Sequence, residues 1–191
     1  MPSSMIHLLT AKKYASDASI EFYIGNLAPD AINEWKEKEI MHFRDKEERL
    51  KELQEFAGRI DLKDDLSKGI LLHLYLDYHW DSGPLENYKK NYEGDNWLTS
   101  YRHETALAGA WLFHHSEWST SLWDEMAEYP IKSYNDISGI RKEDLSDLIN
   151  RNRKWHIENN IGPSFTFTPV FVENFTDKLV VEFSRFLEGL V

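Results

Sequence analysis

The chain contains no cysteine, which excludes a disulfide framework, a thiolate-bound zinc ion and a cysteine nucleophile. Glycine and proline are also scarce, with 9 and 6 among 191 residues, and most of them fall between segments with a helical pattern. No apolar run approaches a membrane span, and the short apolar stretch at the N-terminus precedes two lysines, which is the wrong order for a secretory signal. We therefore expect a cytoplasmic protein with no membrane span.

Basic residues are few as well. The 22 lysines and arginines are outnumbered by 33 acidic residues, which gives a formal net charge of -11. Such a surface repels phosphate backbones and anionic membranes, so we expect no nucleic-acid partner. A bound metal cation can still attract one small anionic substrate, because a nearby ion outweighs distant surface charge.

What the sequence has in abundance is helical periodicity. Apolar residues recur with helical spacing over residues 6–15, 45–59, 62–80, 101–116, 119–128, 142–158 and 174–190. Residues 163–169 read as an extended aromatic loop, and no run shows strand alternation long enough to build a sheet. The pattern predicts an all-α fold, a single-domain multi-helix bundle over residues 1–191 with a metal site among its core helices.

The metal prediction starts from the predicted helix over residues 62–80, whose second half is apolar nearly all round. A buried Asp77 there costs several kcal/mol unless something pairs with it. His73 lies four residues earlier on the same helix face, with Cβ atoms about 6 Å apart. A dication suits this pair because it prefers a deprotonated carboxylate and a neutral imidazole. The alternative is a core His–Asp hydrogen bond that anchors a neighbouring helix.

Three earlier residues are candidates to complete the site. Asp30 follows Pro29 in the turn over residues 25–30, where an aspartate taken alone is typical of a helix N-cap. Taken alone, His42 is typical of a surface or capping residue. His7 lies on the apolar face of the first predicted helix, where a lone histidine is usually a satisfied core residue.

The order of these pieces along the chain resembles a known family. His7-Leu8-Leu9-Thr10-Ala11, the turn Gly25-Asn26-Leu27-Ala28-Pro29-Asp30, His42 and His73-x-x-x-Asp77 follow one another over roughly the first 80 residues. This series resembles the zinc-dependent phospholipase C and S1/P1 nuclease superfamily, in particular the short bacterial branch of the phospholipase C group.

The resemblance implies a set of metal ligands. One zinc would be held by Asp30, His42, His73 and Asp77. A second would use Asp77 as a bridge together with His7, but the family's N-terminal Trp has no counterpart in a chain that begins Met-Pro-Ser-Ser. We therefore expect one or two ions, zinc by resemblance, with iron or manganese also compatible with these ligand types.

The remaining zinc of the family has no clear counterpart. The family uses a later His and a His-x-x-x-Glu or His-x-x-x-Asp pair, whereas no later histidine here has an acidic residue four positions on. His114 or His115 is the candidate to complete a site across helices; the alternative is an aromatic-rich helix end with surface histidines. His79 is expected to face away from His73, and His156 to lie on the surface of a polar helix.

These residues predict metal-dependent hydrolysis, with a small-molecule phosphoester as the substrate. Asp30 would share the general-base role, Asp77 would bridge ions, and Arg44 or Arg102 could contact a phosphate oxygen. A second enzyme interpretation is an HD-type phosphohydrolase. That class needs a histidine directly followed by an aspartate, and no histidine in this chain is directly followed by one. A third reading is a non-catalytic helical protein whose metal site is structural or vestigial and which binds a partner. The sequence leaves room for an oligomer.

Overall fold

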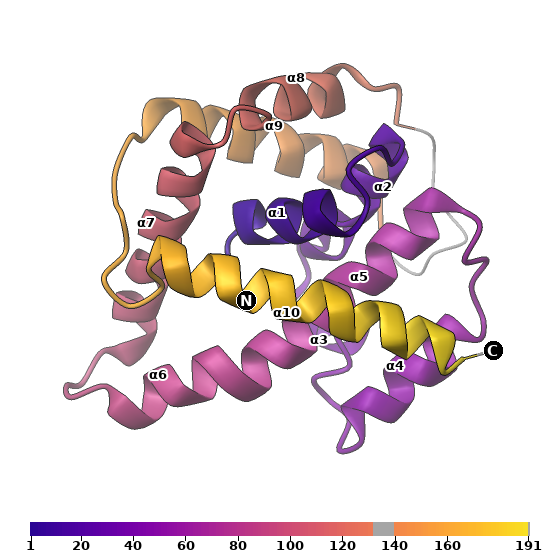
Figure 1. Cartoon of the computed structure of the whole chain (residues 1–191), viewed down its shortest axis with the longest axis horizontal. Coiled ribbons are helices and arrows are strands. Elements are labelled where there is room, and N and C mark those ends of the chain that lie inside the picture. The colour runs from indigo at the N-terminus through magenta and orange to yellow at the C-terminus, as the bar shows by residue number, and fades with distance from the viewer. Residues whose placement is uncertain (132–139, 191) are drawn as a thin grey trace.

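The computed structural model describes residues 1–131 and 140–190. The chain is 71% helical and the described part contains no strand, which confirms the predicted all-α class. The helices in Figure 1 are α1 (Ser4–Tyr14), α2 (Ile20–Gly25), the 3₁₀ turn η1 (Ala28–Ala31), α3 (Trp35–Met41), α4 (Arg49–Ala57), α5 (Asp65–Trp80), the π turn η2 (Asp81–Leu85), α6 (Glu86–Asn91), α7 (Trp97–His115), α8 (Ser119–Glu128), α9 (Lys142–Glu158) and α10 (Pro169–Glu188).

Helix α1 occupies the middle of the molecule. Residues 5–11 are all buried, so this helix has no solvent-facing stripe along most of its length. It packs against α2, α5, α7 and α10, and Figure 1 shows α10 running alongside it, below α1 in this view. The burial on every side explains why the segment around His7 is apolar, and it places that histidine in the core.

Helix α5 is the second buried element, and it lies unusually close to α2. Its start is fixed by Asp64, whose carboxylate accepts hydrogen bonds from the backbone N–H and the hydroxyl of Ser67. A Cβ atom at Gly25 would collide with the Leu66 carbonyl oxygen, and one at Gly69 would collide with the Phe22 carbonyl oxygen. The two glycines thus permit a backbone approach that brings the turn after α2 against α5.

The helix boundaries match the sequence closely for α8 and α9 and less closely elsewhere. The chain remains helical past Trp80, because a π turn containing Pro84 joins α5 to α6 and accommodates the missing proline N–H. Helix α10 begins at Pro169 rather than at residue 174, since the Thr168 hydroxyl caps it by accepting from the Phe171 N–H. The short helices α2, α3 and α6 were not predicted.

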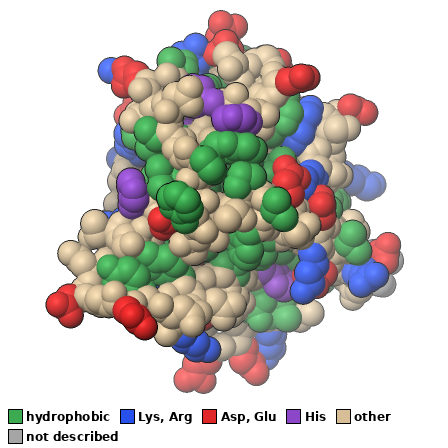
Figure 2. Space-filling model, turned by 60° about the vertical axis from the view of Figure 1, so that its left-hand side comes forward, with side chains coloured by type: hydrophobic (Ala, Val, Ile, Leu, Met, Phe, Trp, Pro, Cys, Tyr) green, Lys and Arg blue, Asp and Glu red, His purple; other side chains and the backbone are tan. Residues whose placement is uncertain are grey.

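The surface carries several exposed apolar side chains. Phe165, Val170 and Trp35 are 90%, 69% and 67% exposed. Figure 2 shows hydrophobic side chains in patches over the middle of one face, with charged side chains mostly toward its edges. Across the described residues, no helix combines the length and the apolar character needed to cross a membrane.

Candidate metal centre

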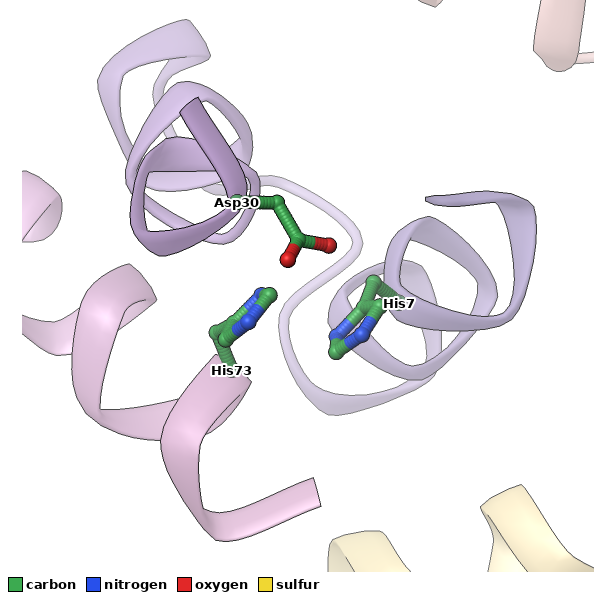
Figure 3. Close-up of side chains that lie close together, drawn as sticks. All are labelled: His7, Asp30 and His73. Atoms are coloured by element: carbon green, nitrogen blue, oxygen red, sulfur yellow. The ribbon is translucent and has the colours of Figure 1, made fainter. Parts of the chain in front are cut away.

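Five side chains from separate segments converge on one point in the core. They are His7 on α1, Asp30 in η1, His42 directly after α3, and His73 and Asp77 on α5. They form two groups that share His73, one with His7 and Asp30 and one with His42 and Asp77, and within each group the possible ligand atoms lie within 4.8 Å of one another. Figure 3 shows the Asp30 carboxylate pointing toward the rings of His7 and His73.

The cluster is almost completely removed from solvent. His7, His42, His73 and Asp77 have no exposed surface, and the side chain of Asp30 is 15% exposed. The rings of His7 and His73 stack with centroids 4.0 Å apart, and His7 Nε2 lies 3.4 Å from Asp77 Oδ1. Neither His7 nitrogen has a hydrogen-bond partner among the described residues, nor has Asp77 Oδ1. Buried polar atoms without partners mark a place where an ion or water is needed.

Two imidazoles are held in one orientation by the backbone. His73 Nδ1 donates to the Asn26 carbonyl oxygen at 2.8 Å, and His42 Nδ1 donates to the Lys38 carbonyl oxygen at 2.7 Å. In the neutral rings, the lone pairs are then on the Nε2 atoms, which face each other 3.1 Å apart. Two lone pairs at that distance repel unless a cation or a proton lies between them. Metal-binding histidines are commonly fixed by this kind of backbone contact.

The electrostatics favour the neutral imidazole state. Burial lowers the pKa of His42 below its usual value, although Asp77 and Asp30 oppose the effect. Burial, reinforced by His7, lowers the pKa of His73 well below its usual value. A proton shared between the two Nε2 atoms is therefore disfavoured near pH 7. Neutral imidazole is the form that binds metal.

Both carboxylates remain ionised despite their burial. Burial alone would raise the pKa of Asp77, but contact with His7 holds that pKa well below its usual value. Where His42 and His73 are neutral, the Arg44 guanidinium, which donates to Asp77 Oδ2 at 2.8 Å, still stabilises the carboxylate. For Asp30, burial is likewise outweighed by His73 and Lys38, so its pKa is lowered. Because His73 is itself neutral near pH 7, the Lys38 ammonium is the charge that keeps the pKa of Asp30 lowered at that pH.

Two basic side chains already contact these carboxylates. Lys38 Nζ lies 3.0 Å from Asp30 Oδ1, and Arg44 Nη2 donates to Asp77 Oδ2 at 2.8 Å. Arg44 also donates through Nε to Asp81 Oδ2 at 2.9 Å. Arg44, a candidate phosphate contact in the sequence, is thus engaged with two aspartates. The sequence reasoning did not identify Lys38 as a partner of the site, and only its spacing of four residues before His42 on α3 hints at it.

The later histidines lie outside both groups. His114 Nε2 donates to the His156 carbonyl oxygen at 3.0 Å, and His115 is exposed and stacks on Trp111 with centroids 4.2 Å apart. The structure therefore does not bring His114 or His115 to the cluster, since both sit at the C-terminal end of α7. His79 faces away from His73 as expected, and its ring packs against that of Tyr75 at a tilt of 51° with centroids 4.5 Å apart.

The prediction that His156 lies on the surface is wrong. Its residue is 2% exposed, its ring stacks on Phe113, and its Nε2 lies 3.2 Å from the Ser4 hydroxyl. The signal was present in the sequence, because Leu145 and Ile149 precede His156 at helical spacing on the buried side of α9.

Comparison with known proteins does not extend this description. No family model matches the chain, and no curated protein and no solved structure matches it either. The cluster can hold a metal ion, and its chemistry follows from the side chains alone.

Proposed function

We propose that the protein is a metal-dependent hydrolase of a small phosphoester, with one or two zinc ions and with iron or manganese as alternatives. The observation that carries this proposal is the pair of Nε2 atoms of His42 and His73, 3.1 Å apart, whose Nδ1 atoms are both committed to backbone carbonyls. Imidazole and carboxylate ligands in one buried pocket suit these ions. The chain order of the ligands, which resembles that of the zinc-dependent phospholipase C and S1/P1 nuclease superfamily, supports hydrolysis.

The group of His42, His73 and Asp77 and the contact between His7 and Asp77 suggest how the ligands divide between two ions. His42, His73 and Asp77 would hold one ion, with Asp30 beside them. His7 would serve a second ion, with Asp77 as the bridge, because Asp77 Oδ1 lies next to His7 and has no hydrogen-bond partner in the described structure.

The two aspartates would have different roles. A bound ion of this type polarises a phosphoryl oxygen and lowers the pKa of a coordinated water. Asp30 lines a cavity of about 460 Å³, so its carboxylate can accept a proton from a water molecule that enters from that side. Asp77 has no exposed surface, so it would hold the imidazoles and any ions in place without touching substrate.

A structural metal site is the second candidate, and one observation favours it. Lys38 and Arg44 already neutralise the two carboxylates, and four of the five side chains have no exposed surface. A structural site is closed, whereas a catalytic site keeps one position open to water and substrate.

The test has two stages. Elemental analysis of the purified chain, before and after loading with zinc, iron or manganese, should find at least one bound ion. Each loaded form is then assayed with 4-nitrophenyl phosphate and bis(4-nitrophenyl) phosphate. Asp30→Asn should reduce hydrolysis, while Asp147→Asn, an exposed carboxylate on α9, should leave it unchanged. A chain that binds none of the three metals contradicts the proposal. Bound metal without hydrolysis in any form replaces it with the structural reading.

A further inference from the structure

A cavity of about 460 Å³ lies beside the metal cluster, between the start of α1 and the helices α7 and α9. Its polar lining includes Ser3, Ser4, Arg102, Arg151, Asn152 and His156. The acidic residue among the side chains that line it is Asp30, which is paired with Lys38. In a chain of net charge -11, a cavity with this lining attracts anions.

The two arginines are free to bind a ligand. In the part of the chain that the structure describes, neither Arg102 nor Arg151 has an ion-pair partner. Arg102 also lines the adjoining cavity of about 580 Å³, but several other basic side chains of that cavity are paired. There, Arg44 and Arg49 are both held by Asp81, and Lys89 is held by Glu86. Among these two cavities, the smaller one therefore combines two guanidinium groups that have no ion-pair partner among the described residues.

The start of α1 adds backbone donors to the same cavity. The Ser3 side chain makes no capping hydrogen bond, and its hydroxyl has no partner among the described residues. The first N–H groups of a helix lack intrahelical partners and carry a partial positive charge, which makes them suited to anions.

His156 provides an independent indication of a ligand. It is 2% exposed, and its Nδ1 has no hydrogen-bond partner within the described ranges. When the Ser4 hydroxyl donates to His156 Nε2, the proton of the neutral ring is on Nδ1 and is available to an anion. A buried ring nitrogen without a partner, beside a helix start and two arginines without ion-pair partners, marks a place for a hydrogen-bonding ligand.

We infer that this cavity binds the phosphate or phosphonate group of a small organic molecule. Donors come from α1, α7 and α9, so they surround the anion from several directions, which suits a tetrahedral group better than a planar carboxylate. Leu27, Leu148 and Trp155 supply apolar wall for the organic part. The inference goes beyond the proposed function, because Arg102, Arg151 and His156 belong to neither of the two groups of candidate metal ligands.

Calorimetric titration of the full chain with phenylphosphonate, which has no ester bond to hydrolyse, tests the inference. Saturable binding is expected, with benzoate, which has the same ring, weaker by about tenfold. The double variant Arg102→Gln/Arg151→Gln should weaken phenylphosphonate binding by about tenfold or more. The matched variant Arg59→Gln/Arg185→Gln removes the same charge away from the cavity and should bind as the wild type does.

Three results would overturn the inference: no saturable binding of phenylphosphonate, equal losses in the two double variants, or equal affinity for benzoate. Melting curves of both variants establish that each is folded. Metal content is measured on the same samples and should not change. Phenylphosphonate binding in a protein that takes up no metal would sink the proposed function and leave this inference standing, and metal binding without phenylphosphonate binding would do the reverse.

Discussion

Two regions of the molecule bury histidine rings, and the side chains that surround the rings differ between them. At the centre, His7, His42 and His73 share a pocket with two carboxylates, whereas His156 at the α1–α9 contact has a serine hydroxyl and aromatic rings around it. Burial lowers the pKa of His73 and of His156 alike. The presence of carboxylates, more than the burial of imidazole, therefore separates the candidate metal centre from the buried His156 that lines the neighbouring cavity.

The largest effect should come from removing a carboxylate at the centre. Asp77→Asn should weaken metal binding by roughly 1,000-fold, beyond the roughly 10–100-fold typical of losing an outer hydrogen-bond partner of a ligand. Competition with a chromogenic chelator measures it. His156→Gln is the matched change in the other region and should leave metal affinity as it is. Equal losses of metal affinity in the two variants would show that the carboxylates do not distinguish the two regions.

The next largest effect is the pH dependence of stability that the buried His156 should cause. Burial, with a smaller contribution from His114, lowers the pKa of His156 to about 4. Since the unfolded chain protonates this histidine near its usual value of 6.5, the unfolded state binds more protons between pH 6.5 and 4, and stability falls as the pH drops through that window. Wild type should lose about 3 kcal/mol more than His156→Gln between pH 7 and 4. Urea unfolding measures this difference, and parallel curves for the two proteins would contradict it.

A backbone change should affect the centre through packing. Gly69→Ala pushes a methyl group into the Phe22 carbonyl oxygen and should cost about 2–3 kcal/mol of stability. It should also lower metal affinity, because the same approach of α2 to α5 places Asn26 against His73. Gly58→Ala is the control, since its Cβ would meet neighbours only at 3.6 Å or more. A Gly69→Ala protein as stable as Gly58→Ala would show that the close approach is dispensable.

The smallest effect should be at the end of α7. His115→Ala removes an exposed ring that stacks on Trp111 and should change stability by less than about 0.5 kcal/mol, with metal content unchanged. Thermal melting and elemental analysis measure both quantities. Loss of metal in this variant would restore His115 as a ligand and would require a rearrangement of α7.

The sequence predicted the helices whose apolar periodicity is continuous. It was less accurate for helix boundaries that depend on a single residue. Helices α8 and α9 follow the pattern to the residue. Pro84 suggests a helix end, but the π turn keeps the chain helical there, and a local pattern does not reveal this. The Thr168 cap and Pro169 mark the start of α10 before its apolar periodicity is established.

The candidate site could be predicted only in part for a related reason. The pairing of His73 with Asp77 follows from one helix, so spacing is enough to find it. The position of His42 depends on where α3 ends, and that of Asp30 on the approach of α2 to α5, which Gly25 and Gly69 permit. Arg44 is near Asp77 only in the folded chain. Contacts between distant segments leave little trace in local sequence.

The convergence of five side chains has a consequence for folding as well as for chemistry. An ion held by residues as distant in sequence as His7 and Asp77 acts as a reversible cross-link that closes a long loop of the unfolded chain. Because the unfolded chain lacks this arrangement, every tenfold excess of metal over its dissociation constant adds about 1.4 kcal/mol to the free energy of unfolding. The availability of metal would thus set what fraction of the chains stays folded under a denaturing condition.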